Sequence, residues 1–197
     1  MIDTKFPLQE WRIVGFSALL IGTICAFVGL IHGVSEEGMR MAIRVTGRTS
    51  TILFVSAFIA SSLQKIWKIP LSTWMLKNRR YLGLSMAVSH TYHAVALVGL
   101  WFVTNGAAPQ IEPLGTLGYV LLIVLTVTSF KIPAKWLGKR GWKILHKTAM
   151  HYLWLGLLFE YGMKLSKSDL IALPFVILLV LAMMLRFAAG RRKEKLV

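Results

Sequence analysis

Residues 79–104 read RRYLGLSMAVSHTYHAVALVGLWFVT, and this stretch decides the fold class. After its two arginines, no Asp, Glu, Lys or Arg occurs up to residue 104. That is long enough for an α-helix to cross the roughly 30 Å hydrocarbon core of a bilayer. Five further predominantly apolar stretches cover residues 11–31, 45–63, 114–130, 144–163 and 170–185. The sequence therefore predicts an all-α protein, a bundle of six transmembrane helices in one domain over residues 1–197.

The composition is typical of an integral membrane protein. Of the 197 residues, 56% are hydrophobic and only 16% are charged, and the mean hydropathy is +0.64, whereas a soluble domain carries more charge. The net charge of +15 would suit nucleic acid, but the basic residues cluster in short segments between the apolar stretches. Because cytoplasmic membrane loops have this pattern, we expect contact with membrane lipid and no nucleic-acid partner.

The basic residues also predict the orientation of the chain. They concentrate in segments 64–80 and 131–143 and in the tail after residue 185, which includes Lys195, while segment 105–113 has none. With six spans, the three basic segments fall on one side of the membrane, and lysine and arginine mark the cytoplasmic side. Both termini are therefore expected in the cytoplasm.

Four histidines lie in two of the predicted spans, His90 and His93 in the third and His146 and His151 in the fifth. Histidine in hydrocarbon is costly unless it is bonded, so it marks a functional site by default. One explanation is that these side chains make hydrogen bonds between helices. The other is that histidines on two parallel helices hold a metal or a haem from opposite sides. Zinc is less favoured, because Cys25 and the acidic residues lie far from these histidines in sequence.

Two motifs resemble those of a known family. Segment 78–84, NRRYLGL, followed by His93, resembles the start of the third helix of ferric reductase-like transmembrane domains. Segments 128–130, TSF, and 142–146, WKILH, resemble the region that leads into the fifth helix of that family. The similarity covers about residues 46–163. Haem-binding membrane subunits of bacterial reductases are the nearer members, and NADPH oxidases and metalloreductases are more distant.

The resemblance implies a b-type haem between the third and fifth helices, with His93 and His146 as its metal ligands. Many family members place a further histidine later on each of these helices and hold two stacked haems. The corresponding positions here fall near Gly106 and at Phe159, which cannot ligate iron through an imidazole. We therefore expect one haem.

The depth of the histidines leaves the ligand pair open. At a rise of about 1.5 Å per residue, His93 lies about 18 Å beyond Tyr81, and His146 lies only about 6 Å beyond Trp142. His90 and His151 each lie about 14 Å in, and so match one another better. We expect the pair His93 and His146, with His90 and His151 as the first alternatives.

Arg44 and Arg48 lie at the start of the second span, one helical turn apart, and so share one face of the helix. They are candidate cofactor-binding residues, because they could pair with haem propionates, an anionic quinol or a substrate. They could equally anchor the helix at the outer membrane surface, where long cationic side chains reach the headgroups.

The sequence has no glycine-rich nucleotide-binding motif, and the tail after residue 185 is too short for a flavin or nicotinamide domain. We expect the electron donor to be a quinol or a separate protein, with FMN or FAD only in that partner. The acceptor is expected to be a partner protein or a ferric substrate. This describes an electron-transfer subunit of an oxidoreductase, and whether it is an enzyme alone stays open. The alternative is a small membrane transporter or assembly protein whose histidines bond other helices.

Overall fold

The computed structural model describes residues 6–109 and 112–194, and these residues form helices and no strand. The prediction of an all-α protein is therefore confirmed for the described part of the chain. Lys195, which belongs to the predicted basic tail, lies outside the described residues. The helices fall into two compact units, which are described separately below. The prediction of one domain over residues 1–197 stays a prediction.

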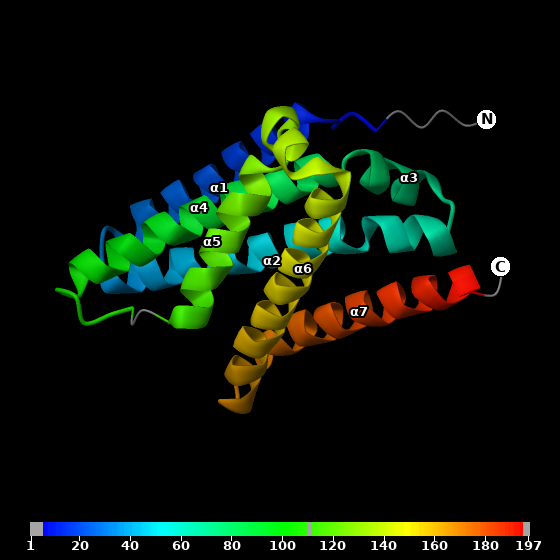
Figure 1. The fold of residues 1–197 in the computed structure, drawn as a ribbon. Helices are drawn as coiled ribbons and strands as arrows, with labels where there is room; N and C mark the ends of the chain where they lie inside the picture. The colour runs from blue at the N-terminus through cyan, green and yellow to red at the C-terminus, as the bar shows by residue number, and fades with distance from the viewer. Residues whose placement is uncertain (1–5, 110–111, 195–197) are drawn as a thin grey trace. The chain divides into compact units, whose positions relative to one another are not determined.

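The first unit contains α1 (Trp11–His32), the part of α2 (Glu36–Ile66) up to Phe54, and α4 (Arg79–Val103). In Figure 1, α1 and α4 lie side by side along most of their length. A small apolar core of Val28, Ala42 and Ala96 joins the three helices. Because no water can satisfy backbone groups within a membrane, helices are the expected form for such apolar segments.

Glycine allows α1 and α4 to approach closely. A Cβ atom built on Gly22 would lie only 2.8 Å from the hydroxyl oxygen of Tyr92. That hydroxyl also donates a hydrogen bond of 3.4 Å to the carbonyl oxygen of Ala18. At the start of the same pair, the rings of Trp11 and Tyr81 meet edge to face at 5.7 Å. Small residues at helix contacts are the usual means of packing transmembrane helices.

The second unit contains the end of α2 from Val55, α3 (Pro70–Lys77), α5 (Pro113–Val127), α6 (Lys131–Ser166), the short 3₁₀ helix η1 (Leu170–Ala172) and α7 (Leu173–Glu194). The helix α6 packs against both α5 and α7. The Trp154 indole donates a hydrogen bond of 2.9 Å to the carbonyl oxygen of Leu179 on α7. The rings of Tyr161 and Phe175 stack at 4.8 Å. These contacts tie the second half of α6 to α7.

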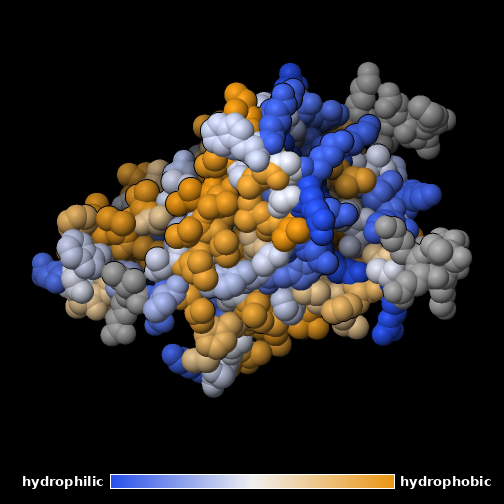
Figure 2. All heavy atoms as spheres, viewed as in Figure 1, coloured by the Kyte–Doolittle hydropathy of each residue, from blue (hydrophilic) through white to orange (hydrophobic). Residues whose placement is uncertain are grey.

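The helices α5 and α6 meet at a sharp bend of 105°. A second break follows within α6, where Gly138 has φ 65° and ψ 167°. This is backbone that glycine adopts at little cost and other residues adopt rarely. Figure 2 shows mainly hydrophobic side chains over α5 and hydrophilic ones around the start of α6. Residues 131–137 before Gly138 are thus a separate short helical piece, distinct from the longer part of α6 that follows.

The number of spans is confirmed only in part. Four helical segments are long and apolar enough to cross a membrane, within α1, α2, α4 and residues 170–191. The pair α5 and α6 adds at most one more span if the two are counted together. For α5 the reason is length, since its 15 residues reach about 22 Å, which is short of the roughly 30 Å apolar core. Four or five spans therefore pass by length and composition, against the six predicted.

Each of the six predicted spans nevertheless coincides with a helix. The agreement is within a few residues for α1, α4 and α5. In contrast, α2 begins at Glu36, nine residues before the predicted start at residue 45, and α6 begins at Lys131 rather than at residue 144. An apolar stretch marks only the part of a helix that suits lipid, while the backbone hydrogen bonds continue through the polar residues beside it.

Candidate functional site

His93 of α4 is held by the backbone and one hydroxyl of α2. Its Nδ1 atom lies 3.1 Å from the carbonyl oxygen of Ile43 and 3.0 Å from Oγ1 of Thr46. The Thr46 hydroxyl donates its own hydrogen to the carbonyl oxygen of Ala42 at 2.6 Å, so its oxygen acts as an acceptor toward His93. Both neighbours of Nδ1 are then acceptors, and this nitrogen carries the ring proton. The lone pair that can bind a metal is therefore on Nε2.

The backbone of α2 lies directly against the His93 ring at Gly47. A Cβ atom on this glycine would stand 3.5 Å from Cε1 of His93 and 3.7 Å from its Nδ1. A larger side chain would push the imidazole off this surface. Gly47 thus completes a cradle for His93, which we define as Ile43, Thr46, Gly47 and the carbonyl of Ala42.

His90 lies on the same side of α4, and its ring stacks on that of His93. The ring centroids are 5.1 Å apart and the planes differ by 22°. Two imidazoles three residues apart on one helix are neighbours, as the helical spacing requires. The structure therefore brings His90 and His93 together, and a group bound by either ring would border the other.

Next to His90 and His93, the hydroxyl groups of serine and threonine residues join α2 to α4. The Ser89 hydroxyl donates to the carbonyl oxygen of Thr46 at 3.1 Å and lies 2.8 Å from the Thr49 hydroxyl. The Ser50 hydroxyl donates to the Ser89 hydroxyl at 2.9 Å. Ser50, Ser89 and Thr46 are each fully buried, with 0% of their surface exposed. These bonds fasten the two helices to one another.

In the second unit, His146 of α6 contacts the end of α5. Its Nε2 atom lies 3.0 Å from Oγ1 of Thr128, whose hydroxyl donates to the carbonyl oxygen of Val124 at 2.6 Å. The Trp142 ring stacks on the imidazole at 4.0 Å and donates through Nε1 to the carbonyl oxygen of Thr128 at 2.9 Å. In this arrangement Nε2 of His146 faces a hydrogen-bonding partner.

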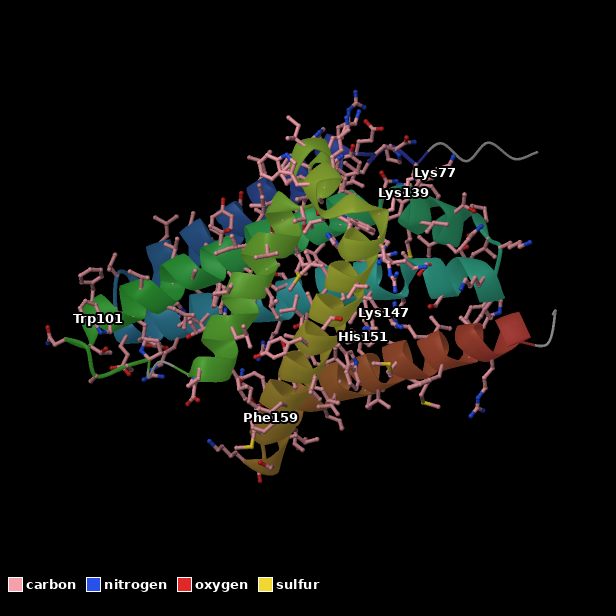
Figure 3. All side chains as sticks on the ribbon, in the orientation of Figure 1. Lys77, Trp101, Lys139, Lys147, His151 and Phe159 are labelled. Carbon is pink, nitrogen blue, oxygen red and sulfur yellow. The ribbon has the colours of Figure 1, made fainter. Side chains whose placement is uncertain are left out.

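His151 lies just over one turn further along α6, with Lys147 between the two histidines (Figure 3). Its Nδ1 atom lies 2.6 Å from the carbonyl oxygen of Lys147, which fixes the proton on Nδ1 and the lone pair on Nε2. Its ring meets Phe58 of α2 edge to face at 5.6 Å. Arg186 of α7 lies over the same Phe58 ring, with its guanidinium 4.2 Å from the ring centre.

Arg44 and Arg48 lie on α2 as predicted, one turn apart, but not at its start. The helix begins at Glu36, so the two arginines are 8 and 12 residues into it, which is about 12 Å and about 18 Å along its axis. Arg44 is exposed and Arg48 is partly buried. Arg44 directly precedes Val45 and Arg48 directly follows Gly47, so the two arginines flank Thr46 and Gly47 of the cradle along the helix.

The six predicted site residues are thus divided between the units. The first unit holds His90, His93 and both arginines, and the second holds His146 and His151. The pairing of His93 with His146 stays a prediction. Two sets of contacts were not predicted from the sequence, those of His93 with Ile43 and Thr46 and that of His151 with Phe58. The sequence signal for the His93 contacts was a threonine followed by a glycine on the second span, Thr46 and Gly47.

The chemistry of these residues fits a haem. An axial imidazole needs a fixed tautomer, an acceptor on the nitrogen that faces away from iron, and apolar surroundings. His93 has the first two from its cradle, and the neighbouring core of Val28, Ala42 and Ala96 is apolar. His151 has a comparable Nδ1 acceptor in Lys147. His146 has an aromatic neighbour and a hydroxyl at Nε2.

Comparison with known proteins supports this chemistry. Residues 46–157 match the family described as the ferric reductase like transmembrane component. Proteins named protein-methionine-sulfoxide reductase heme-binding subunit MsrQ, from Salmonella paratyphi B, Salmonella newport and Salmonella enteritidis, are 29% identical to the chain over 164 residues. The match covers 73% of this chain and 76% of each relative. No solved structure matches the chain.

Proposed function

The chain belongs to the family of ferric reductase-like transmembrane components, and we propose that it is a b-type haem protein that relays electrons in a bacterial inner membrane. It is a multi-pass integral membrane protein, as the family and its apolar helices show. Haem binding is the role named for the Salmonella relatives. Haem, when bound, supplies the one-electron chemistry, while the chain holds it, orients it and keeps water away.

We assign His93 as one axial ligand. The observation that carries the proposal is its cradle, in which Ile43 and Thr46 accept the Nδ1 proton and leave the lone pair on Nε2. A histidine that merely joined two helices would need one such acceptor, whereas this one has two on α2. Histidines that bind a metal through one ring nitrogen usually donate a hydrogen bond from the other, and that bond fixes the orientation of the ring.

The second ligand comes from α6, and the family resemblance favours His146. Ligation through its Nε2 atom requires the contact with the Thr128 hydroxyl to open. His151 is the alternative, because its Nε2 can ligate while the bond from Nδ1 to Lys147 is kept. We propose one haem per chain, since Gly106 and Phe159 stand where a second pair of ligands would be needed.

Arg44 and Arg48 are proposed to bind the carboxylate groups of the cofactor. They lie within α2 rather than at its end, and an arginine inside a transmembrane segment normally pairs with an anion or faces a polar cavity. An anionic quinol is the other ligand that this pair would suit. Both ligand classes need the two cations on one helix face.

For topology, we propose that all six long helices cross the membrane, with both termini in the cytoplasm. The support is the charge of the connections, since the basic segments 64–80 and 131–143 and the tail then share the cytoplasmic side. Electrons would enter from a quinol or from a separate flavin protein carrying FMN or FAD. They would leave to a partner protein or a ferric substrate. A partner protein would agree with the name of the Salmonella relatives, which calls each of them a subunit.

A second candidate function is a transporter or assembly protein without redox activity. The observation in its favour is that both His93 and His146 make contacts between helices, to α2 and to the end of α5. Such hydrogen bonds alone can account for histidine in a membrane helix.

The deciding experiment is a reduced-minus-oxidised visible spectrum of the purified chain, expressed with ample haem, beside four histidine-to-alanine variants. We expect a low-spin b-type spectrum that is lost in His93→Ala and His146→Ala and kept in His90→Ala and His151→Ala. Loss in His151→Ala with retention in His146→Ala would transfer the second ligand to His151. A folded wild-type chain without haem would contradict the redox proposal and favour the transporter.

A further inference from the structure

The Thr46 hydroxyl is fully buried and lies against His93, a proposed ligand. Its oxygen lies 3.0 Å from Nδ1 of His93, and its hydrogen goes to the Ala42 carbonyl at 2.6 Å. A threonine that satisfied only its own helix would need no contact with α4. The oxygen is therefore placed as an acceptor for a proton that comes from the other helix.

We propose that Thr46 is a positioning residue that sets the electron-donating strength of His93, and through it the affinity and reduction potential of the haem. The inference rests on the proposed function, in which His93 ligates iron through Nε2. An acceptor at Nδ1 draws the ring proton away and makes Nε2 a stronger donor. A stronger donor stabilises ferric iron more than ferrous iron, so the hydrogen bond lowers the potential.

The geometry distinguishes Thr46 from the other hydroxyls on α2. Thr49 lies one turn on in the same buried interface, but it contacts Ser89 and carbonyl groups of its own helix. The Thr46 hydroxyl, in contrast, lies 3.0 Å from Nδ1 of His93, within hydrogen-bonding distance. The neighbouring Gly47 keeps that ring close, since no side chain separates it from the backbone.

The test uses the full-length chain in nanodiscs, with Thr46→Val as the variant that removes the hydroxyl and preserves the shape. Thr46→Ser restores an acceptor, and Thr49→Val removes a hydroxyl from the same interface without touching His93. We expect Thr46→Val to bind haem about 10-fold more weakly and to shift the midpoint potential to a more positive value. We expect Thr46→Ser to return both toward wild type and Thr49→Val to leave the potential unchanged.

A measurement without haem keeps this test separate from the proposed function. In the apoprotein labelled with ¹⁵N-histidine, the ring nitrogen shifts report which nitrogen of His93 carries the proton. We expect the proton on Nδ1, with its resonance displaced in Thr46→Val. A proton on Nε2 in the wild-type chain, or a haem-loaded Thr46→Val chain with unchanged affinity and potential, would overturn the inference. If the wild type bound no haem but showed the Nδ1 proton, the hydrogen bond would stand and the function would fail.

Discussion

Ser89→Ala is the sharpest test of how α2 and α4 are joined. The Ser89 hydroxyl makes three contacts with α2, to the Thr49 hydroxyl, the Ser50 hydroxyl and the carbonyl oxygen of Thr46. Hydrogen bonds between membrane helices contribute about 0.6 kcal/mol each on average. Removing three therefore costs about 1.8 kcal/mol, or about a 20-fold shift of the folding equilibrium toward the unfolded state.

That value is a lower bound, because Ser50 is fully buried and its hydroxyl donates to Ser89. A buried hydroxyl that loses its partner adds a desolvation cost. The assay is equilibrium unfolding in mixed micelles with increasing denaturing detergent. The matched control is Thr91→Ala on the same helix, since Thr91 is exposed and bonds only the carbonyl oxygen of Ala87 on its own helix. We expect the control to stay within about 0.5 kcal/mol of wild type. Equal stability of the two variants would refute the account of the α2–α4 interface.

Two further predictions use the same unfolding assay. Gly22→Ala should be at least about 1 kcal/mol less stable than Gly15→Ala, because its new methyl would meet the Tyr92 hydroxyl while Gly15 faces open space; equal stability of this pair would contradict the close approach of α1 to α4. Arg186→Gln should lose about 2 kcal/mol, since the guanidinium donates to the Phe58 carbonyl at 2.7 Å and lies over its ring. Arg186→Lys should recover part of that loss, and a wild-type value for the glutamine variant would show that these contacts contribute nothing.

Much of the fold could be predicted because lipid imposes a simple rule on sequence. An apolar stretch of sufficient length must be a helix, and all six predicted stretches are helical. The break at Gly138 could not be predicted, because a single glycine in a basic segment is compatible with either a continuous helix or a turn. The end of α5 at Val127 could not be predicted either, because the sequence has no charged residue between Val127 and the bend.

The candidate site could be predicted only as far as its histidines. Imidazole is rare enough in a membrane helix that His90, His93, His146 and His151 are visible from composition alone. Their partners are carbonyl oxygens and ordinary threonines, which every helix contains. The rotation of α2 relative to α4 determines that Thr46, rather than another threonine, contacts His93. That rotation follows from helix packing rather than from any local motif. The tautomer of each histidine is therefore information that only the fold supplies.

The most direct test of the central claim is the haem content of the His93→Ala variant, measured as pyridine haemochrome per chain beside His32→Ala. His32 ends α1, and its Nδ1 atom lies 3.6 Å from Oε1 of Glu37, so it controls for the loss of a histidine outside the proposed site. We expect one haem per chain in the wild type and in His32→Ala, and none in His93→Ala. A folded His93→Ala protein that keeps its full haem content would contradict the assignment of His93 as a ligand.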